Sequence, residues 1–553
     1  MTAATAGASP RFVWVTFGLA VVVWLSCLNL RPLFNPDEGR YAEIPREMLA
    51  SGDWVLPRLN GLIYLEKPPL QYWATASVYA AFGARAWTAR LVTALAAVLG
   101  VWVVARLGEL LWDRSRGLQA AAMTGSMLFY VFLGQLLTLD MLLCLWLTLA
   151  VAAFCFGQRL WPVAPQRARG AMLVCWLAMA AGTLTKGLIG IVIPGAVLVL
   201  YSVLARDLRI WRQLALWPGL VLYAVVVAPW FLLVERAHAG ALSFLIIHEH
   251  FQRYLTTTHD RYQPWWWFAP VLCAGVLPWL PQTLYALATG WRRSVTPGEF
   301  DGPRLIWIAA VFILVFFSLS DSKLAPYVLP VLPLVALLGS TRDPTGERLL
   351  AMSAILALAL ALLAGVALAG FAHWTSRPES LAIYRSVAPV LGVAAALIAL
   401  GALLALYWRR SVPRAAGALA CAHFLAALLL ATVGAGALAW KYSGAGLAPA
   451  LRAGLAAAAP GTEVYSLRTY DWTLPFYTQR SLIPVEYRGE LDYGLKIAPD
   501  RGIATLAEFA ERWRSEPQAF ALVEPAELTA LAAVNVPARE LARTPELVLL
   551  SRR

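Results

Sequence analysis

The chain has 553 residues, of which 60% are hydrophobic and only 14% are charged. Soluble globular proteins contain about 25% charged residues, and repeated apolar runs of around 20 residues are typical of transmembrane helices, so the composition excludes a soluble protein. The net charge of +13 comes largely from arginine in short loops, as membrane topology requires, and we expect no nucleic-acid partner.

The first membrane-length apolar run covers residues 12–30. Only Arg11 precedes it and no small-x-small cleavage site follows it, so we expect a retained span rather than a cleaved signal. In all, about thirteen segments are long enough to cross a bilayer. They lie near residues 12–30, 85–111, 117–134, 139–158, 170–184, 188–205, 213–234, 265–290, 304–319, 325–340, 348–372, 386–407 and 415–440.

Arginine is concentrated in alternate loops. With the N-terminus in the cytoplasm, each of six cytoplasmic loops is rich in arginine, which is the pattern of the positive-inside rule. The outer loops are then 31–84, 135–138, 185–187, 235–264, 320–324, 373–385 and the tail from residue 441. We therefore predict a polytopic α-helical protein with a transmembrane domain, residues 1–440, and a periplasmic domain, residues 441–553.

The tail differs from the rest of the chain, because its apolar runs are shorter and its charge is higher. The segments 463–467, 519–523 and 546–550 are typical of strands, whereas 444–459 and 506–514 are typical of helices. The tail shows no catalytic motif, so we expect a small α/β domain that covers the membrane part.

The first outer loop carries a dense mixture of charges, NPDEGRYAEIPREMLASGDWVLPRLNGLIYLEKPPLQYW, over residues 35–73. We expect two short helices near 37–51 and 68–82 that lie along the membrane surface. The loop between them contains Tyr64, Glu66 and Lys67.

Charged residues recur at the same predicted face in other segments. Asp140 opens a span, Lys186 lies in the turn TLTKGLIG, Lys323 lies in SLSDSKLAPYVLP, and His250 and Arg253 lie in HEHFQRYL. Transporters tend to place such groups near the bilayer midplane, so this pattern weighs against a transporter. The pattern favours a cavity that opens at the outer leaflet of the membrane.

Cations beside carboxylates in that cavity suit a lipid that bears a phosphate. The cations that we assign to it are Lys67, Lys186, Arg253 and Lys323. The alternative for each cation alone is contact with a lipid headgroup.

Several of these segments resemble one family. NPDEGRYAEI followed by LEKPPLQYW is similar to the lipid A aminoarabinose transferases, which belong with the protein O-mannosyltransferases to a larger set of membrane glycosyltransferases. TLTKG, HFQRY and SDSKLAPYVLP also resemble later segments of the family. That set shares an acidic residue in its first outer loop, which corresponds here to Asp37.

The resemblance implies a GT-C fold in the bacterial inner membrane, with its active site on the periplasmic face. It implies transfer of 4-amino-4-deoxy-L-arabinose from undecaprenyl phosphate to a lipid A phosphate, and hence resistance to polymyxin and other cationic peptides. The partners would be this donor, lipid A and membrane lipids, and we expect a monomer.

Such a transfer requires that the leaving phosphate is stabilised and that the acceptor is placed on the opposite face of the sugar. Asp37 and Asp140 are the candidate catalytic carboxylates. Asp37 would act as a general base or orient the acceptor; its alternative role is a cap for the helix after Pro36. Arg40 would share a helical face with Asp37 and would hold either the phosphate or Asp37.

The remaining candidates are contacts to sugar, carrier or metal. Tyr64, Glu66 and Tyr327 are candidate contacts to the sugar or its carrier, although Tyr327 would also fit an aromatic belt. Glu66 with His248 or His250 could bind a divalent metal such as zinc. No DxD-type motif is present, so we expect that no cofactor is required.

Two other functions compete with this one. A protein O-mannosyltransferase-like enzyme would use a polyprenyl-phosphate sugar but would require a peptide-binding outer domain. A lipid transporter would require midplane charges or inverted repeats, and the sequence shows neither clearly.

Overall fold

The computed structural model describes residues 10–252, 262–292, 299–341, 343–374, 378–534 and 536–552. The chain forms two compact units. Unit 1 comprises Met1–Leu28, Glu66–Gln71 and Leu91–Gly434, and unit 2 comprises Asn29–Leu65, Tyr72–Arg90 and Ala435–Arg553. The expected division at residue 440 stays a prediction.

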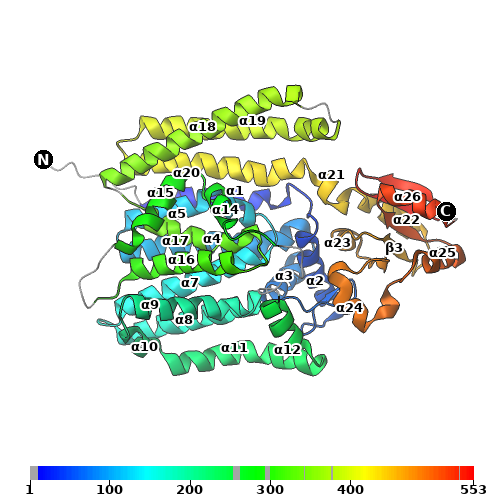
Figure 1. Cartoon of the computed structure of the whole chain (residues 1–553), viewed down its shortest axis with the longest axis horizontal. Coiled ribbons are helices and arrows are strands. Elements are labelled where there is room, and N and C mark those ends of the chain that lie inside the picture. Colours follow the sequence, from blue (N-terminus) through cyan, green and yellow to red (C-terminus); the bar gives the residue numbers. More distant parts are fainter. Residues whose placement is uncertain are drawn as a thin grey trace. The chain divides into compact units, whose positions relative to one another are not determined.

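Unit 1 is helical over most of its described length (Figure 1). Its longer helices are α1 (Pro10–Ser26), α4 (Ala86–Leu111, which starts in unit 2), α5 (Arg114–Ser126), α7 (Leu139–Leu160), α8 (Pro165–Lys186), α9 (Ile189–Leu204), α11 (Leu216–Ala237), α15 (Leu280–Thr289), α16 (Gly302–Leu319), α18 (Pro344–Trp374), α19 (Pro378–Tyr407) and α20 (Val412–Leu429). The shorter elements are α6 (Leu128–Gly134), α10 (Arg209–Gln213), α12 (Ala241–Ser243), α14 (Phe268–Gly275), α17 (Val331–Gly339), the 3-10 helices η1 (Cys27–Asn29), η3 (Gly290–Arg292) and η4 (Ala325–Val328), and the π-helices η2 (Phe244–Gln252) and η5 (Leu430–Gly434). Of these, η1 ends in unit 2.

Eight helices of the described chain are long and apolar enough to cross a membrane, and the bent pair α5 and α6 raises that number to nine. Three shorter apolar helices, Val13–Asn29, Ile189–Leu204 and Ala325–Gly339, coincide with further expected spans. The predicted multi-pass helical protein is confirmed, but a count of thirteen spans is not.

Prolines and bends explain part of the difference between the expected and the observed spans. The expected span 265–290 is two helices, α14 and α15, and Pro278 and Pro281 lie where one ends and the next begins. Proline lacks the amide proton and clashes with the preceding turn, so it ends a helix. The expected span 117–134 bends by 65° between α5 and α6.

Helices α7, α8 and α9 pack against one another in unit 1, as the ribbons of Figure 1 show. The contact of α8 with α9 depends on glycine, since a Cβ on Gly190 would lie 2.2 Å from the backbone nitrogen of Thr183. Gly187, with φ of 82°, ends α8 immediately after Lys186. The sequence TKG therefore fixes Lys186 at a helix end.

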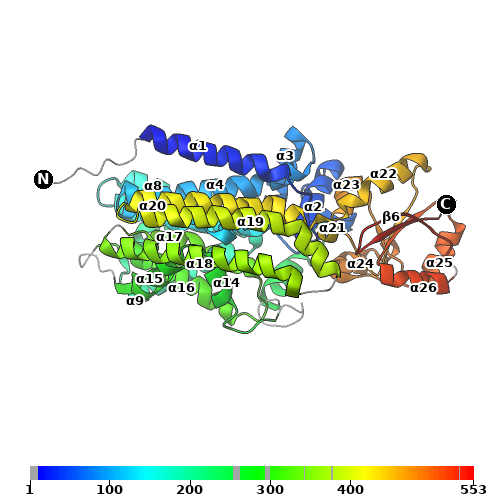
Figure 2. The same ribbon diagram turned by 90° about the horizontal axis from the view of Figure 1, so that it is seen from above.

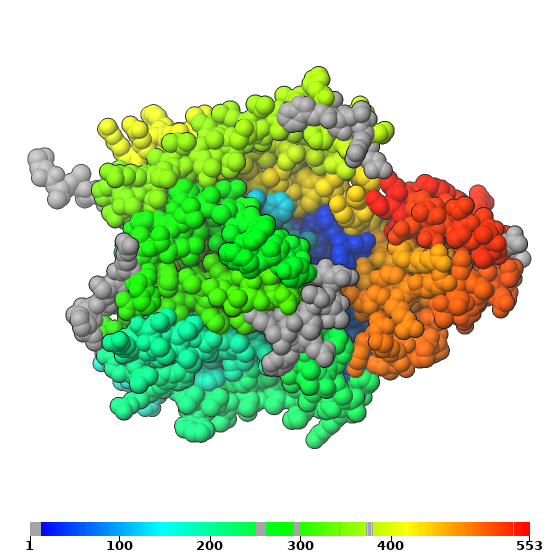
Figure 3. Space-filling model, viewed as in Figure 1, coloured from blue at the N-terminus to red at the C-terminus, as the bar shows by residue number. Residues whose placement is uncertain are grey.

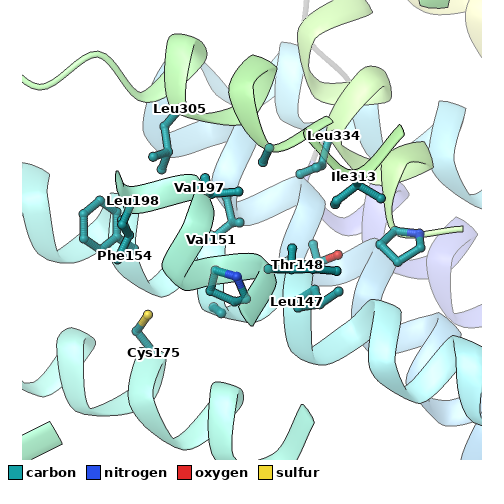
Figure 4. A pocket seen from close by; sticks show the side chains of 15 residues that line it. Leu147, Thr148, Val151, Phe154, Cys175, Val197, Leu198, Leu305, Ile313 and Leu334 are labelled. Atoms are coloured by element: carbon teal, nitrogen blue, oxygen red, sulfur yellow. The ribbon is translucent and has the colours of Figure 1, made fainter. Parts of the chain in front are cut away.

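Side chains fill the gaps between the helix ribbons of unit 1, as the space-filling view shows (Figure 3). Unit 1 contains an apolar cavity of about 30 Å³, lined by side chains that include Phe154, Cys175, Val197, Leu305 and Leu334 (Figure 4). An apolar cavity of this size stays dry. It contains none of the predicted site residues.

Unit 2 contains a five-stranded sheet in the order β4-β3-β5-β7-β6. Strands β3, β4 and β5 are parallel, and β7 is antiparallel to both β5 and β6. The strands are β3 (Val464–Leu467), β4 (Ile483–Val485), β5 (Phe520–Val523), β6 (Arg539–Arg543) and β7 (Val548–Ser551). The helices of this part are α21 (Ala439–Tyr442), α22 (Ala448–Ala457), α23 (Leu474–Thr478), α24 (Asp492–Ile497), α25 (Leu506–Ser515) and α26 (Leu528–Ala533), with 3-10 helices η6 (Gly444–Gly446), η7 (Gly489–Leu491), η8 (Pro499–Arg501) and η9 (Pro525–Glu527).

The core of this α/β part lies between the sheet and helices α25 and α26, which Figure 2 shows beside the strands. Tyr465 on β3 and Phe509 and Trp513 on α25 are fully buried there. The predicted α/β tail is confirmed, with the three predicted strands, β3, β5 and β7, and with helices in both predicted places, α22 within 444–459 and α25 near 506–514. Strands β4 and β6 were not predicted.

Most of the first outer loop belongs to unit 2, whereas its segment Glu66–Gln71 belongs to unit 1. It forms α2 (Asp37–Ser51), the two-stranded ladder of β1 (Arg58–Leu59) and β2 (Leu62–Ile63), and α3 (Leu70–Phe82), which starts in unit 1. Helices are present at both expected places, and their position along the membrane surface stays a prediction. The side chain of Asn60 bonds to the backbone of Leu482 through both its amide atoms, so the loop packs against the tail.

Candidate functional site

Asp37 is the first residue of α2, and Pro36 occupies the cap position without a capping side chain. The alternative role of Asp37 as the helix cap is therefore wrong. Its carboxylate is half exposed, at 47%, and is ion-paired with Arg40 one turn later. The predicted shared face of Asp37 and Arg40 is confirmed.

Arg40 holds Asp37 and is itself held from two sides. Its guanidinium donates to the hydroxyl of Tyr64 at 3.2 Å and forms an ion pair with Glu490 on η7. Only 5% of the Arg40 side chain is exposed. Of the two predicted roles of Arg40, the structure shows the one in which it holds Asp37; binding of a phosphate stays a prediction.

Glu38, the next residue along the chain, points into unit 2 rather than outward. Its carboxylate accepts hydrogen bonds from Arg90 Nε at 2.7 Å and Arg90 Nη2 at 2.8 Å, and it is ion-paired with Arg31. All three side chains are at most 3% exposed. Burial alone would raise the pKa of Glu38, but the two guanidiniums hold it well below its ordinary value.

Within unit 1, Asp140 and Lys186 form an ion pair. Asp140 lies in the first turn of α7 and Lys186 is the last residue of α8, so each charge has the sign that its helix end favours. The Lys186 ammonium lies 4.7 Å from the ring centroid of Tyr327 on η4. The structure thus brings together three of the predicted residues, from three separate segments.

Lys67 forms a second cationic site in unit 1. Its ammonium donates to Glu249 Oε2 and to the backbone carbonyl of Glu66, both at 2.7 Å. The Lys67 side chain is 12% exposed and that of Glu249 is 2% exposed. Glu249 lies on the π-helix η2.

Lys323 has a different environment. Its ammonium donates to the backbone carbonyls of Gln263 and Ser320, and the residue is 5% exposed. Burial lowers the pKa of Lys323 below its ordinary value. These contacts fit a lysine that closes a loop, and its binding to phosphate stays a prediction.

The predicted metal site at Glu66, His248 and His250 stays a prediction. Among the described residues, no three His, Cys, Asp or Glu side chains lie close enough to hold a metal ion. His248 Nδ1 lies 3.4 Å from Glu249 Oε1. The side chain of His250 and the whole of Arg253 lie outside the described residues, so their predicted roles stay predictions.

Four residues of these ion pairs were not predicted. Glu249 pairs with Lys67, Glu490 pairs with Arg40, and Glu38 and Arg90 pair with each other. Glu38 and Glu249 had a weak signal, since each stands beside a residue that the analysis selected. Arg90 and Glu490 had none, because their partners are distant in sequence.

Two family models match the chain. The one described as "Aminoarabinose transferase C-terminal domain" matches residues 447–552, and the one described as "Dolichyl-phosphate-mannose-protein mannosyltransferase" matches residues 66–232.

Curated relatives match over part of their length. An undecaprenyl phosphate-alpha-4-amino-4-deoxy-L-arabinose arabinosyl transferase of Yersinia enterocolitica is 35% identical over 323 residues, which are 57% of this chain and 56% of that protein. A second, from Sodalis glossinidius, is 35% identical over 68% of this chain and 67% of its own length. The match thus spans between half and two thirds of these relatives.

Solved structures match over more of the chain. ArnT from Cupriavidus metallidurans, in the apo state and bound to undecaprenyl phosphate, is 32% identical over 99% of both chains, with a TM-score of 0.89. An oligosaccharyltransferase of Archaeoglobus fulgidus is 12% identical over 95% of this chain and 70% of its own, with a TM-score of 0.51, and this likeness concerns the fold alone. The predicted GT-C fold is confirmed.

Proposed function

Because the chain belongs to the family of aminoarabinose arabinosyl transferases, we propose that it transfers 4-amino-4-deoxy-L-arabinose from undecaprenyl phosphate to a phosphate of lipid A. The observation that carries the proposal is the match over 99% of both chains to an ArnT that was solved bound to undecaprenyl phosphate. The chain would act in the bacterial inner membrane, with its site on the periplasmic face.

The contacts within unit 1 support a phosphate-bearing donor. Lys67 lies shortly before α3 and Lys186 is the last residue of α8, and each is mostly buried beside a carboxylate. A buried lysine beside a carboxylate is held in place as a charged group. Such preorganised cations stabilise charge that develops on a leaving phosphate.

The proposed transfer forms one bond and breaks one bond. An oxygen of the lipid A phosphate attacks the anomeric carbon of the sugar, and the bond from that carbon to the carrier phosphate breaks. The carrier phosphate keeps the electron pair of the broken bond and leaves as undecaprenyl phosphate. The acceptor phosphate has a second pKa of about 6, so at neutral pH it needs little help from a base.

Asp37 would then mainly orient the reactants. Its carboxylate is half exposed although the helix turn that follows it is buried, and Arg40 fixes its direction. We propose that it positions the acceptor or the ammonium group of the sugar. Asp140 would act through Lys186, with which it is paired.

Mass spectrometry of lipid A tests this function. Cells that lack their own transferase but make the donor would be compared with and without this chain. We expect an added aminoarabinose on a lipid A phosphate and increased survival in polymyxin. Unmodified lipid A in cells that contain the folded protein and the donor would contradict the proposal.

The match of residues 66–232 to a mannosyltransferase model favours one second candidate, in which a polyprenyl-phosphate sugar is transferred to a protein hydroxyl. Proteomic mass spectrometry of the same cells separates the two functions. Glycosylated Ser or Thr peptides that depend on the chain, with lipid A unchanged, would support the second. Translocation of labelled lipid in vesicles without any covalent transfer would instead support a transporter.

A further inference from the structure

The carboxylate of Glu249 contacts the Lys67 ammonium at 2.7 Å. Its side chain is 2% exposed, so its charge has little contact with water. A buried carboxylate without a cation is costly, and Lys67 therefore stabilises Glu249 as much as Glu249 stabilises Lys67. Any other anion that binds the Lys67 ammonium must compete with this pair.

We propose that Glu249 competes with the carrier phosphate for the Lys67 ammonium. Glu249 leaves Lys67 when the carrier lipid binds and returns to Lys67 to expel the product. This proposal rests on the function proposed above, in which Lys67 binds the carrier phosphate. It assigns to Glu249 the role of setting the affinity for a phosphate monoester, a role distinct from that of a group that reacts with the sugar.

The charges of substrate and product explain why a competitor is useful. In the donor, the phosphate is a diester that links lipid and sugar and carries one negative charge. In the product it is a monoester, which carries about −1.5 to −2 charges at pH 7. A cationic site therefore binds the product more tightly than the donor, and product release would limit turnover. A carboxylate that competes for the same ammonium weakens the binding of the monoester.

The backbone at Glu249 is suited to such a movement. Residues Phe244–Gln252 form a π-helix, a conformation that is rare and that occurs frequently at functional sites. In contrast, Lys186 pairs with a carboxylate on α7, a regular helix of 22 residues. The pairs Lys67–Glu249 and Lys186–Asp140 thus differ, since only the first has its carboxylate on an irregular helix.

The test compares the wild type with Glu249→Gln, which removes the charge and keeps the shape. Binding of undecaprenyl phosphate to the purified full-length proteins would be measured in detergent with EDTA present, and undecaprenol, which lacks the phosphate, would serve as the control ligand. We expect Glu249→Gln to lower the Kd for undecaprenyl phosphate about tenfold and to leave undecaprenol binding unchanged. In the transfer reaction we expect a lower KM, a lower kcat and stronger inhibition by added undecaprenyl phosphate.

A matched control is Glu109→Gln, which removes a carboxylate that is paired with Arg106 on the exposed side of α4. We expect no change in Kd for that variant. If Glu249→Gln does not fold, as judged by size-exclusion chromatography, Glu249→Asp retracts the charge by one methylene and should lower the Kd to a smaller extent.

Two results would overturn the inference. Equal or weaker binding of undecaprenyl phosphate by the Glu249 variants, with a wild type that binds and transfers, would show that Glu249 only holds Lys67 in place. A wild type that neither binds undecaprenyl phosphate nor transfers sugar would contradict the proposed function itself, and with it this role of Glu249.

Discussion

Lys186 and Asp140 form an ion pair between the last residue of α8 and the first turn of α7. The Tyr327 ring lies 4.7 Å from the same ammonium. A carboxylate and the face of an aromatic ring both attract a cation. Together, Asp140 and Tyr327 therefore fix the position of the Lys186 ammonium group. Our proposed phosphate contact thus has a fixed geometry before any lipid binds.

We expect Lys186→Met to reduce kcat/KM by about 100-fold and Asp140→Asn by about tenfold, because the first removes the cation and the second only its orientation. Initial transfer rates at varied donor concentration would measure both. Arg106→Met, which removes a cation at the exposed surface of α4, is the control and should retain full activity. Full activity of Lys186→Met would exclude this lysine from the site.

Asp37→Asn and Lys67→Ala should each abolish sugar addition to lipid A while leaving the protein folded in the membrane. Loss of an orienting or proton-accepting carboxylate reduces rates by about 10²–10⁴-fold. Asp53→Asn is the matched control for Asp37, since Asp53 lies in the same loop, and an asparagine oxygen can still accept the hydrogen bonds that Asp53 accepts from the backbone of Val55 and Leu56. Retained lipid A modification in both Asp37→Asn and Lys67→Ala would contradict the proposed site.

Local sequence patterns predicted the parts of the site that depend on neighbouring residues. The spacing of Asp37 and Arg40 placed them on one helical face, and α2 shows that pair. The turn TKG placed Lys186 at a helix end, where Gly187 stops α8. In each case the physical cause, helical periodicity or a glycine with positive φ, acts within a few residues.

Partners that are distant in sequence could not be predicted in this way. Arg40 meets Glu490 only because the first loop and the tail fold into one unit, and no local pattern encodes that contact. Strand β4 has three residues and contains Pro484, so it lacks the alternation that marks a strand. A hydropathy profile also shows α14 and α15 as one span, because it does not take account of Pro278 between them and Pro281 in the first turn of α15.

Unit 2 should lose stability in acid because of Glu38. Arg31 and Arg90 depress the pKa of Glu38 although burial opposes them, so its stabilising effect is fully present above the ordinary pKa of 4.5 and is lost as the pH falls below it. Thermal unfolding in detergent between pH 6 and pH 3.5 would show a falling Tm. Glu38→Gln should lower the free energy of unfolding at pH 6 by about 3–5 kcal/mol, because it leaves two buried cations without their charge partner.

The control for this experiment is Glu508→Gln, which changes an exposed residue of α25 in the same unit. Its Tm should follow that of the wild type at every pH. An acid dependence of Tm that persists unchanged in Glu38→Gln would assign it to other carboxylates.

Glu43, on the same helix α2, should have the opposite effect. Burial raises the pKa of Glu43 from 4.5 to about 7, despite its hydrogen bonds with Arg46. Its stabilising effect is therefore fully present below pH 4.5 and is lost as the pH rises through 7. The wild type should therefore lose stability as the pH rises from 5 to 8, and Glu43→Gln, whose side chain cannot ionise, should show a smaller fall in Tm over this range. An equal fall would place the group that titrates elsewhere.

Gly39, between Glu38 and Arg40, allows α2 to contact the tail. A Cβ at this position would lie 2.5 Å from the backbone carbonyl of Trp472 and 2.8 Å from the backbone nitrogen of Thr473. Because these are backbone atoms, a side-chain rotation cannot relieve the clash, and Gly39→Ala should lower the free energy of unfolding by about 1–3 kcal/mol. The displaced turn also carries Asp37, so transfer activity should fall as well. Gly18→Ala in α1, where a Cβ meets nothing within 4 Å, is the control for both measurements, and an equal Tm for the two variants would show that the contact of Gly39 with Trp472 is not close.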